Sequence, residues 1–415
     1  MGDLGSLFMT TQETPNRGLP AQSGFNGLGI APEFLKILEK NNFITPTPIQ
    51  RQAILPAMEG SDIVGIAQTG TGKTLAFGLP LLQRLRGSKS IGLIVLPTRE
   101  LAIQADEMLQ KIGRSLGLVT AVLIGGEGMG RQIMALRRRP NIIIATPGRL
   151  LDHTEHGLRL DNVGIVILDE ADRMLDIGFA PQIRKILVLV PVKRQTMLFS
   201  ATMPPEIVHL ASAYMATPVR VEVAPTGTAA ELVDQEIFLV KKELKFKLLE
   251  DLLNECRGTV LIFSRTKHGA RKICSAIGDM GYRVAEIHSN RSLGQRKEAL
   301  AGFKSGRYRI LVATDIAARG IDVQGIELVI NYDLPDNSHD YVHRIGRTGR
   351  AGVIGRAVSF ATPDQQRDVR DIERLIRKQI PVIPHGDAIF LSGGTSRSFG
   401  RNQHMRRAPR KWRRI

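Results

Sequence analysis

The chain has 415 residues, 43% of them hydrophobic, which is enough for two ordinary domains with separate buried cores. Its formal net charge is +17, and this excess of Lys and Arg favours a polyanionic partner such as nucleic acid. A membrane surface is the competing partner. Against it, no apolar run reaches the roughly 18 residues of a spanning helix, and the basic residues share no helix face with apolar ones.

The cysteines and the N-terminal segment indicate the compartment. Cys256 and Cys274 have neither the spacing of a zinc site nor that of a disulfide framework, so buried thiols in a reducing compartment are expected. Residues 1–23 lack the basic start and the continuous apolar core of a secretory signal. We therefore expect a cytoplasmic protein.

Short runs of Val, Ile and Leu recur along the chain, separated by stretches long enough for a helix. This pattern is typical of parallel sheets that are covered by helices on both faces. In the first half of the chain, strands are expected at residues 62–66, 91–96, 119–124, 142–145, 163–168 and 197–199. In the second half they are expected at residues 237–240, 260–263, 284–287, 310–312, 328–330 and 357–360. The predicted fold class is therefore α/β, with two tandem domains that each contain a mainly parallel sheet.

Changes in composition predict the domain boundaries. Residues 224–231 are mostly small residues with Pro and Gly, which is typical of a linker. We therefore expect a flexible N-terminus over residues 1–24, a first domain over 25–223 and a second over 232–384. Residues 385–415 are rich in Gly, Ser and Arg and predict a disordered basic tail. Trp412 among its basic residues favours contact with RNA, and a solvated charge run is the alternative.

The first candidate site is the loop after the expected strand at residues 62–66. In such a loop the backbone N–H groups and the N-terminus of the following helix face phosphates. Lys73 would reach the β- and γ-phosphate oxygens, and the Thr74 hydroxyl would hold Mg²⁺. The loop begins with Ala, where the usual pattern has Gly. The residues expected to bind the nucleotide are Ala67, Gln68, Thr69, Gly70, Thr71, Gly72, Lys73 and Thr74.

Two acids follow the expected strand at residues 163–168. Asp169 stands where phosphate-loop enzymes place the carboxylate that holds Mg²⁺. Glu170 is expected to orient and deprotonate the attacking water. Solvated acids at a strand end are the alternative, but the pairing with Lys73 favours hydrolysis of a nucleoside triphosphate.

An arginine cluster in the second half of the chain completes the candidate site. Arg344, Arg347 and Arg350 are spaced by three, so on a helix they would fall along one side. Arginines that reach a γ-phosphate stabilise the charge that develops in the transition state. Their contribution raises the reaction rate by a factor of about 10³ to 10⁵. A surface ion-pair network is the alternative. Because the cluster and the loop lie in different halves, the nucleotide is expected between the domains, with closure as part of catalysis.

With these motifs, the sequence from about residue 25 to about residue 384 resembles the DEAD-box RNA helicases of superfamily 2. The resemblance implies two RecA-like domains, with ATP and Mg²⁺ as cofactors. Residues 46–50 resemble the adenine-reading motif of the family. This similarity implies that Gln50 reads the adenine edge and that Phe25 stacks on the base. Asn42 stands where the family usually has Gly.

The same resemblance implies contacts with the sugar-phosphate backbone of single-stranded RNA or a short RNA duplex. Strand-end hydroxyls, Gly amides and Arg side chains suit phosphate oxygens. The expected contacts are Pro97, Thr98, Arg99, Gly126, Thr146 and Arg149 in the first domain, and Gln295, Arg296, Thr314 and Gly320 in the second. The aromatic content of 5% agrees, since backbone contacts need few stacking platforms.

Further residues are implied to link the ATP site to the RNA. By similarity, Asp315 would contact the ribose, and Arg347 and Arg350 the γ-phosphate. The residues implied to couple hydrolysis to strand separation or to hold the interdomain network are Ser200, Thr202, Arg319, Asp322 and His343.

The implied function is an ATP-dependent RNA helicase that separates short duplexes and remodels RNA–protein complexes. A DNA translocase would contain a similar ATPase site, but the sequence Asp-Glu-Ala-Asp at residues 169–172, together with Gln50, argues for RNA. A non-catalytic RNA clamp would lack turnover, and Glu170, Arg347 and Arg350 argue against it. Ribosome-associated and RNA-decay proteins are candidate partners among which the sequence does not choose. The short flanks of the core favour a bacterial source.

Overall fold

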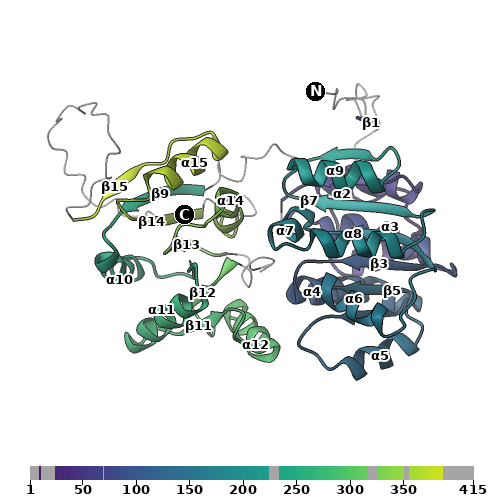
Figure 1. Cartoon of the computed structure of the whole chain (residues 1–415), viewed down its shortest axis with the longest axis horizontal. Helices are drawn as coiled ribbons and strands as arrows, with labels where there is room; N and C mark the ends of the chain where they lie inside the picture. The colour runs from purple at the N-terminus through teal and green to yellow at the C-terminus, as the bar shows by residue number, and fades with distance from the viewer. Residues whose placement is uncertain are drawn as a thin grey trace.

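The computed structural model describes residues 9–10, 24–68, 70–223, 233–315, 323, 325–349 and 355–386. Within them the chain forms two α/β units, one before and one after residues 224–232 (Figure 1). The predicted linker and residues 387–415 of the predicted tail lie outside the described residues, and so do Thr69, Arg319, Gly320, Asp322 and Arg350. None of the helices in the described part is long and apolar enough to cross a membrane.

The first unit contains an eight-stranded sheet in the order β1-β8-β2-β7-β6-β3-β5-β4, and neighbouring strands are parallel. Its strands are β1 (Met9–Thr10), β2 (Ile63–Ile66), β3 (Ile91–Val95), β4 (Thr120–Leu123), β5 (Ile142–Ala145), β6 (Val163–Leu168), β7 (Gln195–Ser200) and β8 (Val219–Glu222). Its helices are α1 (Pro32–Lys40), α2 (Pro48–Met58), α3 (Lys73–Leu85), α4 (Arg99–Gly113), α5 (Met129–Arg137), α6 (Pro147–Glu155), α7 (Ala171–Asp176), α8 (Ala180–Leu189) and α9 (Pro205–Tyr214).

The sheet of the first unit is buried on both faces. Consecutive residues of β2 show this arrangement, because side chains alternate across a strand. Ile63 belongs to an apolar cluster with residues of α1 to α4, whereas Val64 belongs to a second cluster with residues of α6 to α9. Burial on both faces explains why strands such as β5 and β6 are continuously apolar.

The second unit repeats the architecture with a seven-stranded parallel sheet in the order β11-β12-β10-β13-β14-β9-β15. Its strands are β9 (Val233–Leu239), β10 (Val260–Phe263), β11 (Val284–Ile287), β12 (Ile310–Ala313), β13 (Leu328–Asn331), β14 (Gly355–Ala361) and β15 (Val382–Pro384). Its helices are α10 (Lys245–Glu255), α11 (Lys267–Asp279), α12 (Leu293–Lys304), α14 (Ser338–Ile345) and α15 (Gln366–Ile376).

The predicted α/β class with two parallel sheets is confirmed. Three strands had not been expected: β1 at an edge of the first sheet, β8 between β1 and β2, and β15 at an edge of the second sheet. The last two read Val-Arg-Val-Glu and Val-Ile-Pro, and most of their residues are at least partly exposed. Such short, partly exposed strands lack the long apolar run that predicts a buried strand.

Candidate nucleotide site and interdomain surface

The predicted phosphate loop joins β2 to α3 at the C-terminal edge of the first sheet. Gly72 has the left-handed φ of +91° and is the N-cap of α3, which begins at Lys73. A Cβ atom at Gly72 would lie 2.3 Å from Nε2 of Gln50 and would displace that side chain, and the positive φ strains any residue other than Gly. The first backbone N–H groups of α3 have no partners within the helix, which is the arrangement that binds phosphate.

Lys73 is buried between the two acids that follow β6. Its Nζ lies 2.8 Å from Oε1 of Glu170 and 3.9 Å from Oδ1 of Asp169. Burial disfavours the charge on Lys73, but the two carboxylates outweigh burial and raise its pKa. The loop and the acidic pair therefore form one site, with the lysine charged at neutral pH.

The surroundings shift the pKa values of the two acids in opposite directions. Burial raises the pKa of Asp169 to about 7, although Lys73 opposes this effect. Burial also acts on Glu170, but there the nearby Lys73 ammonium outweighs it and lowers the pKa to about 2. Lys73 thus compensates Glu170 and leaves Asp169 short of positive charge. A carboxylate in this condition suits a hard cation, as the predicted Mg²⁺ would be.

Glu170 has an unusual backbone conformation. It is the N-cap of α7 with φ +55° and ψ +49°, a left-handed conformation that non-Gly residues seldom adopt. Such a conformation persists only where the surroundings hold it in place. Here the buried Lys73 ion pair helps to do so, and the strain marks the residue expected to position water.

Asp172 joins the acidic tetrad to the end of β7. Its Oδ2 accepts hydrogen bonds from the backbone N–H groups of Ala201 at 3.1 Å and Thr202 at 2.8 Å, and from the Thr202 hydroxyl at 2.8 Å. In return, Oγ of Ser200 accepts from the backbone N–H of Asp172 at 3.1 Å. The predicted coupling residues Ser200 and Thr202 are therefore bonded directly to the segment that carries Glu170.

The predicted adenine-reading residues lie beside the loop. Nε2 of Gln50 donates to the carbonyl of Gly72 at 3.0 Å, and its Oε1 accepts from the backbone N–H of Thr47 at 2.9 Å. Phe25 is 5% exposed and packs in the first apolar cluster. Asn42 has φ +60°, which is consistent with a family preference for Gly at this position. Adenine contacts of Gln50 and Phe25 stay predictions.

The predicted RNA contacts of the first unit gather at one edge of its sheet. They follow the C-terminal ends of β3, β4 and β5, which are neighbours in the sheet. The Arg99 guanidinium lies over the glycine pair, since a Cβ at Gly126 would lie 2.2 Å from its Nη1. Nη1 of Arg149 donates to the carbonyl of Glu127 at 3.1 Å. Pro97, Thr98 and Thr146 precede α4 and α6 at the same edge.

An ion pair joins the two units. Nη2 of Arg296 on α12 lies 2.5 Å from Oε1 of Glu100 on α4, and both side chains are less than a tenth exposed. Leu293, also on α12, packs against the first apolar cluster of the first unit. Oε1 of Gln295 accepts the Ser292 N–H within the cap of α12. Glu100 was not among the predicted site residues, because its partner lies 196 positions away.

Arg344 is fully buried and holds Asp315. Its Nε and Nη2 lie 2.6 and 2.7 Å from the two carboxylate oxygens, and Nη1 donates to the carbonyl of Asp333 at 2.6 Å. The expectation that Arg344 and Arg347 share one side of a helix is wrong, because α14 ends at Ile345. Arg347 follows in a turn, where its Nε donates to the carbonyl of His343 at 3.2 Å. The N–H of Gly346 still bonds to the carbonyl of Val342, whereas the N–H of Arg347 bonds to the carbonyl of Arg344, three positions back, so the chain has left the α-helix at Arg347.

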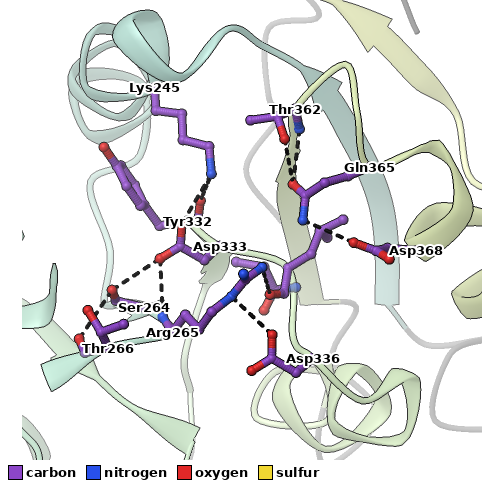
Figure 2. Close-up of polar contacts among 12 residues, drawn as sticks. Lys245, Ser264, Arg265, Thr266, Tyr332, Asp333, Asp336, Thr362, Gln365 and Asp368 are labelled. Atoms are coloured by element: carbon purple, nitrogen blue, oxygen red, sulfur yellow. Dashed lines mark hydrogen bonds and ion pairs between the residues drawn. The ribbon is translucent and has the colours of Figure 1, made fainter. Parts of the chain in front are cut away.

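A polar network supports the segment after β10 in the second unit (Figure 2). Lys245 donates to the carbonyl of Tyr332 at 2.7 Å and to Oδ1 of Asp333 at 3.1 Å. Oδ2 of Asp333 accepts from the Ser264 hydroxyl at 3.2 Å and the Arg265 N–H at 3.1 Å. Burial opposes the charge of Asp333, but Lys245 and these bonds outweigh it and lower its pKa. The network had not been predicted, since its members are far apart in sequence.

Family comparisons agree with this geometry. Residues 47–210 match the DEAD/DEAH box helicase family, and residues 244–352 match the helicase conserved C-terminal domain. The chain is 42% identical over 365 residues to the ATP-dependent rRNA helicase RRP3 of Debaryomyces hansenii, covering 87% of this chain and 76% of that protein. It is also 42% identical over 360 residues to the DEAD-box ATP-dependent RNA helicase CshA of Bacillus cereus, covering 86% and 69%. The chain belongs to the DEAD-box family of ATP-dependent RNA helicases.

Solved structures extend the similarity to the arrangement of the two units. S. cerevisiae Dbp5 bound to RNA and ADP BeF3 matches with a TM-score of 0.78 at 29% identity, covering 87% of this chain and 96% of that one. Mss116p bound to ssRNA and AMP-PNP matches with a TM-score of 0.80 at 29% identity, covering 86% and 78%. A DEAD box protein from Methanococcus jannaschii is 37% identical, yet its TM-score is 0.52. Similarity in overall arrangement therefore does not follow sequence identity.

Proposed function

We propose that this helicase couples ATP hydrolysis at Lys73, Asp169 and Glu170 to the local separation of short RNA duplexes and the remodelling of RNA–protein complexes. The buried pair of Lys73 and Glu170, at 2.8 Å, carries the proposal because it joins the phosphate loop to the residue expected to position water. Solvated acids at a strand end would not be buried against a phosphate-loop lysine.

The residues present fit ATP with Mg²⁺. Thr74 and Asp169 would hold the cation, and its chemistry there is to neutralise the charge of the β- and γ-phosphates. Lys73 would exchange part of its contact with Glu170 for the phosphate oxygens. Glu170 would then be available to orient a water and take its proton. Arg347 and Arg350 would approach the γ-phosphate from the second unit, which makes closure a condition for hydrolysis.

RNA would bind across both units, along the edge that carries Arg99, Gly126 and Arg149 in the first unit and Thr314 in the second. Arg side chains and backbone amides at this edge suit phosphate oxygens rather than bases, so little sequence preference is expected. The Arg296–Glu100 pair and the match to two RNA- and nucleotide-bound structures support a closed arrangement of this kind. The cytoplasm is the proposed compartment, and ribosome-associated or RNA-decay proteins are the proposed partners.

Steady-state ATP hydrolysis with and without single-stranded RNA tests the proposal. We expect RNA to stimulate the wild-type rate, and Lys73→Ala to abolish both the basal and the stimulated rates because it removes the cation of the phosphate loop. Lys89→Ala, at an exposed position before β3, is the matched control and should keep the wild-type response. An unstimulated wild-type enzyme, or stimulation by DNA as strong as by RNA, would refute the proposal.

A second prediction concerns the interdomain ion pair. Arg296→Gln and Glu100→Gln should each weaken RNA binding at saturating ATP, because each leaves a charge without its partner in the closed arrangement. The double variant should lose less RNA-binding free energy than the sum of the losses in the two single variants. The difference, which is the coupling energy of the pair, should be about 0.5 to 3 kcal/mol.

Equilibrium binding of labelled RNA, measured over this double-mutant cycle, checks the result. Arg307→Gln and Glu298→Gln, whose exposed ion pair lies within the second unit, form the control cycle and should change RNA affinity little. Strict additivity of the Arg296 and Glu100 effects would mean that Arg296 acts through RNA alone.

A further inference from the structure

Helix α5 and the two residues that follow it carry arginines that the proposed ATP and RNA sites do not use. Arg131, Arg137, Arg138 and Arg139 are all at least partly exposed, and no acidic residue occurs between positions 128 and 140. Within the described part of the chain, none of the four forms an ion pair with another residue. Figure 1 places α5 at the margin of the first unit, below β5 and α6. We call these four residues the α5 arginines.

The inner side of α5 is fixed, so the arginines have a defined direction. Gln132 is 2% exposed, and its Nε2 donates to the carbonyl of Ile124 at 2.7 Å. Its Oε1 lies 2.8 Å from Nε2 of His153 on α6. Burial lowers the pKa of His153, which keeps the ring neutral and adds no charge to this contact. The exposed Arg131 and Arg137 therefore lie on the part of the helix that faces away from this contact, and Arg138 and Arg139 follow its last residue.

The arrangement is unfavourable for the isolated helix. Arg131 lies in the first turn, where the helix dipole disfavours a cation. Arg137 to Arg139 place three like charges next to one another. Arg139 has φ +54° just after the helix, a left-handed position that usually carries Gly. A basic residue in the last turn is common because it complements the dipole, but that explanation covers neither Arg131 nor Arg139.

The position of α5 indicates the partner. The helix begins three residues after Gly126, and the loop between them is held by the bond from Arg149 to the carbonyl of Glu127. The predicted RNA edge therefore runs directly into the first turn of α5. From Arg131 to Arg138 the chain rises about 10 Å along the helix axis, which is long enough to reach more than one phosphate of a strand.

We propose that the α5 arginines form a second RNA-binding surface, which contacts the phosphates of a strand that extends beyond the predicted edge at Arg99, Gly126 and Arg149. This inference rests on the proposed RNA-binding function. The surface recognises the charge of the phosphates and not the base sequence, because contacts between arginine and phosphate do not distinguish one base from another. Its effect is to favour substrates whose RNA continues past the helicase core.

The test compares Arg137→Glu/Arg138→Glu with the matched charge reversal Arg184→Glu/Lys185→Glu on α8, whose two residues are also exposed. Binding is measured for the shortest RNA that stimulates ATP hydrolysis, and for the same RNA extended at its 5′ or 3′ end. The α5 variant should lose the gain in affinity that an extension gives, whereas the α8 variant should keep it. The charge-conserving variant Arg137→Lys/Arg138→Lys should also keep it.

Salt dependence supplies a second measure. Loss of two phosphate contacts should reduce the slope of log K against log salt for the extended RNA by about 1.4, at about 0.7 per contact. When salt rises from 50 to 200 mM, the affinity of the α5 glutamate variant for extended RNA should therefore fall by a factor about seven times smaller than the affinity of wild type does.

Three results would overturn the inference. The α5 and α8 reversals could have the same affinity and slope, the lysine variant could bind as weakly as the glutamate variant, or polyglutamate could compete as well as extended RNA. The last result would assign the surface to an acidic protein. Failure of wild type to bind the short RNA would instead refute the proposed function, so the two failures are distinguishable.

Discussion

Glu170→Gln is expected to lower the rate of RNA-stimulated ATP hydrolysis by about 10²- to 10⁴-fold, the usual contribution of a positioned general base. Glutamine has nearly the same size as glutamate but cannot take a proton from water. The effect should appear in the chemical step, because the pKa of Glu170 near 2 leaves the carboxylate ionised throughout the neutral range. Single-turnover hydrolysis with ATP and RNA prebound measures that step directly.

The same substitution should separate binding from turnover. A glutamine amide in place of the Glu170 carboxylate would leave the Lys73 ammonium without its closest anion, which favours phosphate oxygens as the replacement partner. Release of labelled RNA in the presence of ATP should therefore be slower than from wild type, because release waits for hydrolysis. Glu206→Gln, at an exposed position in the first turn of α9, is the control and should match wild type in both assays. Hydrolysis by Glu170→Gln at the wild-type rate would remove Glu170 from the mechanism.

The parts of the fold that sequence predicted well are those with local causes. Strands such as residues 142–145 and 163–168 are buried on both faces, so each is a continuous apolar run that needs no knowledge of its neighbours. The phosphate loop could be predicted for the same reason, because the residues that form it are consecutive in the sequence. Its small residues, the left-handed Gly72 and the helix that follows can all be read from one segment.

The helix boundary at Ile345 shows where a local rule misleads. A spacing of three predicts one helix face only if the helix continues, and Gly346 and Gly349 interrupt the arginine segment. Arg344 therefore faces the interior of the second unit, whereas Arg347 lies in the turn beyond α14. A glycine among periodic charges is the signal that could have separated the two residues.

Pairings between distant segments could not be predicted from spacing. Glu100 and Arg296 belong to different units, and Lys245 meets Asp333 from 88 positions away. Each residue alone reads as an ordinary surface charge. Only the tertiary fold makes them partners, since the first pair joins helices α4 and α12 of different units and the second joins the start of α10 to a residue just after β13.

Arg344→Ala is expected to destabilise the second unit by about 3 to 5 kcal/mol, the range for breaking a buried ion pair by removing one partner. The substitution leaves Asp315 without its bidentate partner and the carbonyl of Asp333 without its Arg344 donor. It also removes the guanidinium that lies 5.1 Å from the centre of the Phe263 ring. The stability of Arg344→Lys should lie between those of wild type and Arg344→Ala, since lysine keeps the charge but lacks the planar guanidinium with its paired donors.

Hydrogen exchange of the full-length protein locates the effect, because two units need not unfold in one transition. Amides of β13 and α14 should exchange faster in Arg344→Ala, and amides of β2 and β6 in the first unit should not change. Arg374→Ala removes an exposed arginine that pairs with Asp371 on α15, and its cost should stay within about 0.5 kcal/mol. If β13 and α14 exchanged alike in the two variants, the buried pair would contribute nothing beyond a surface one. An increase confined to the second unit would instead identify Arg344 as the residue that holds the ends of β12 and β13 together, before any nucleotide binds.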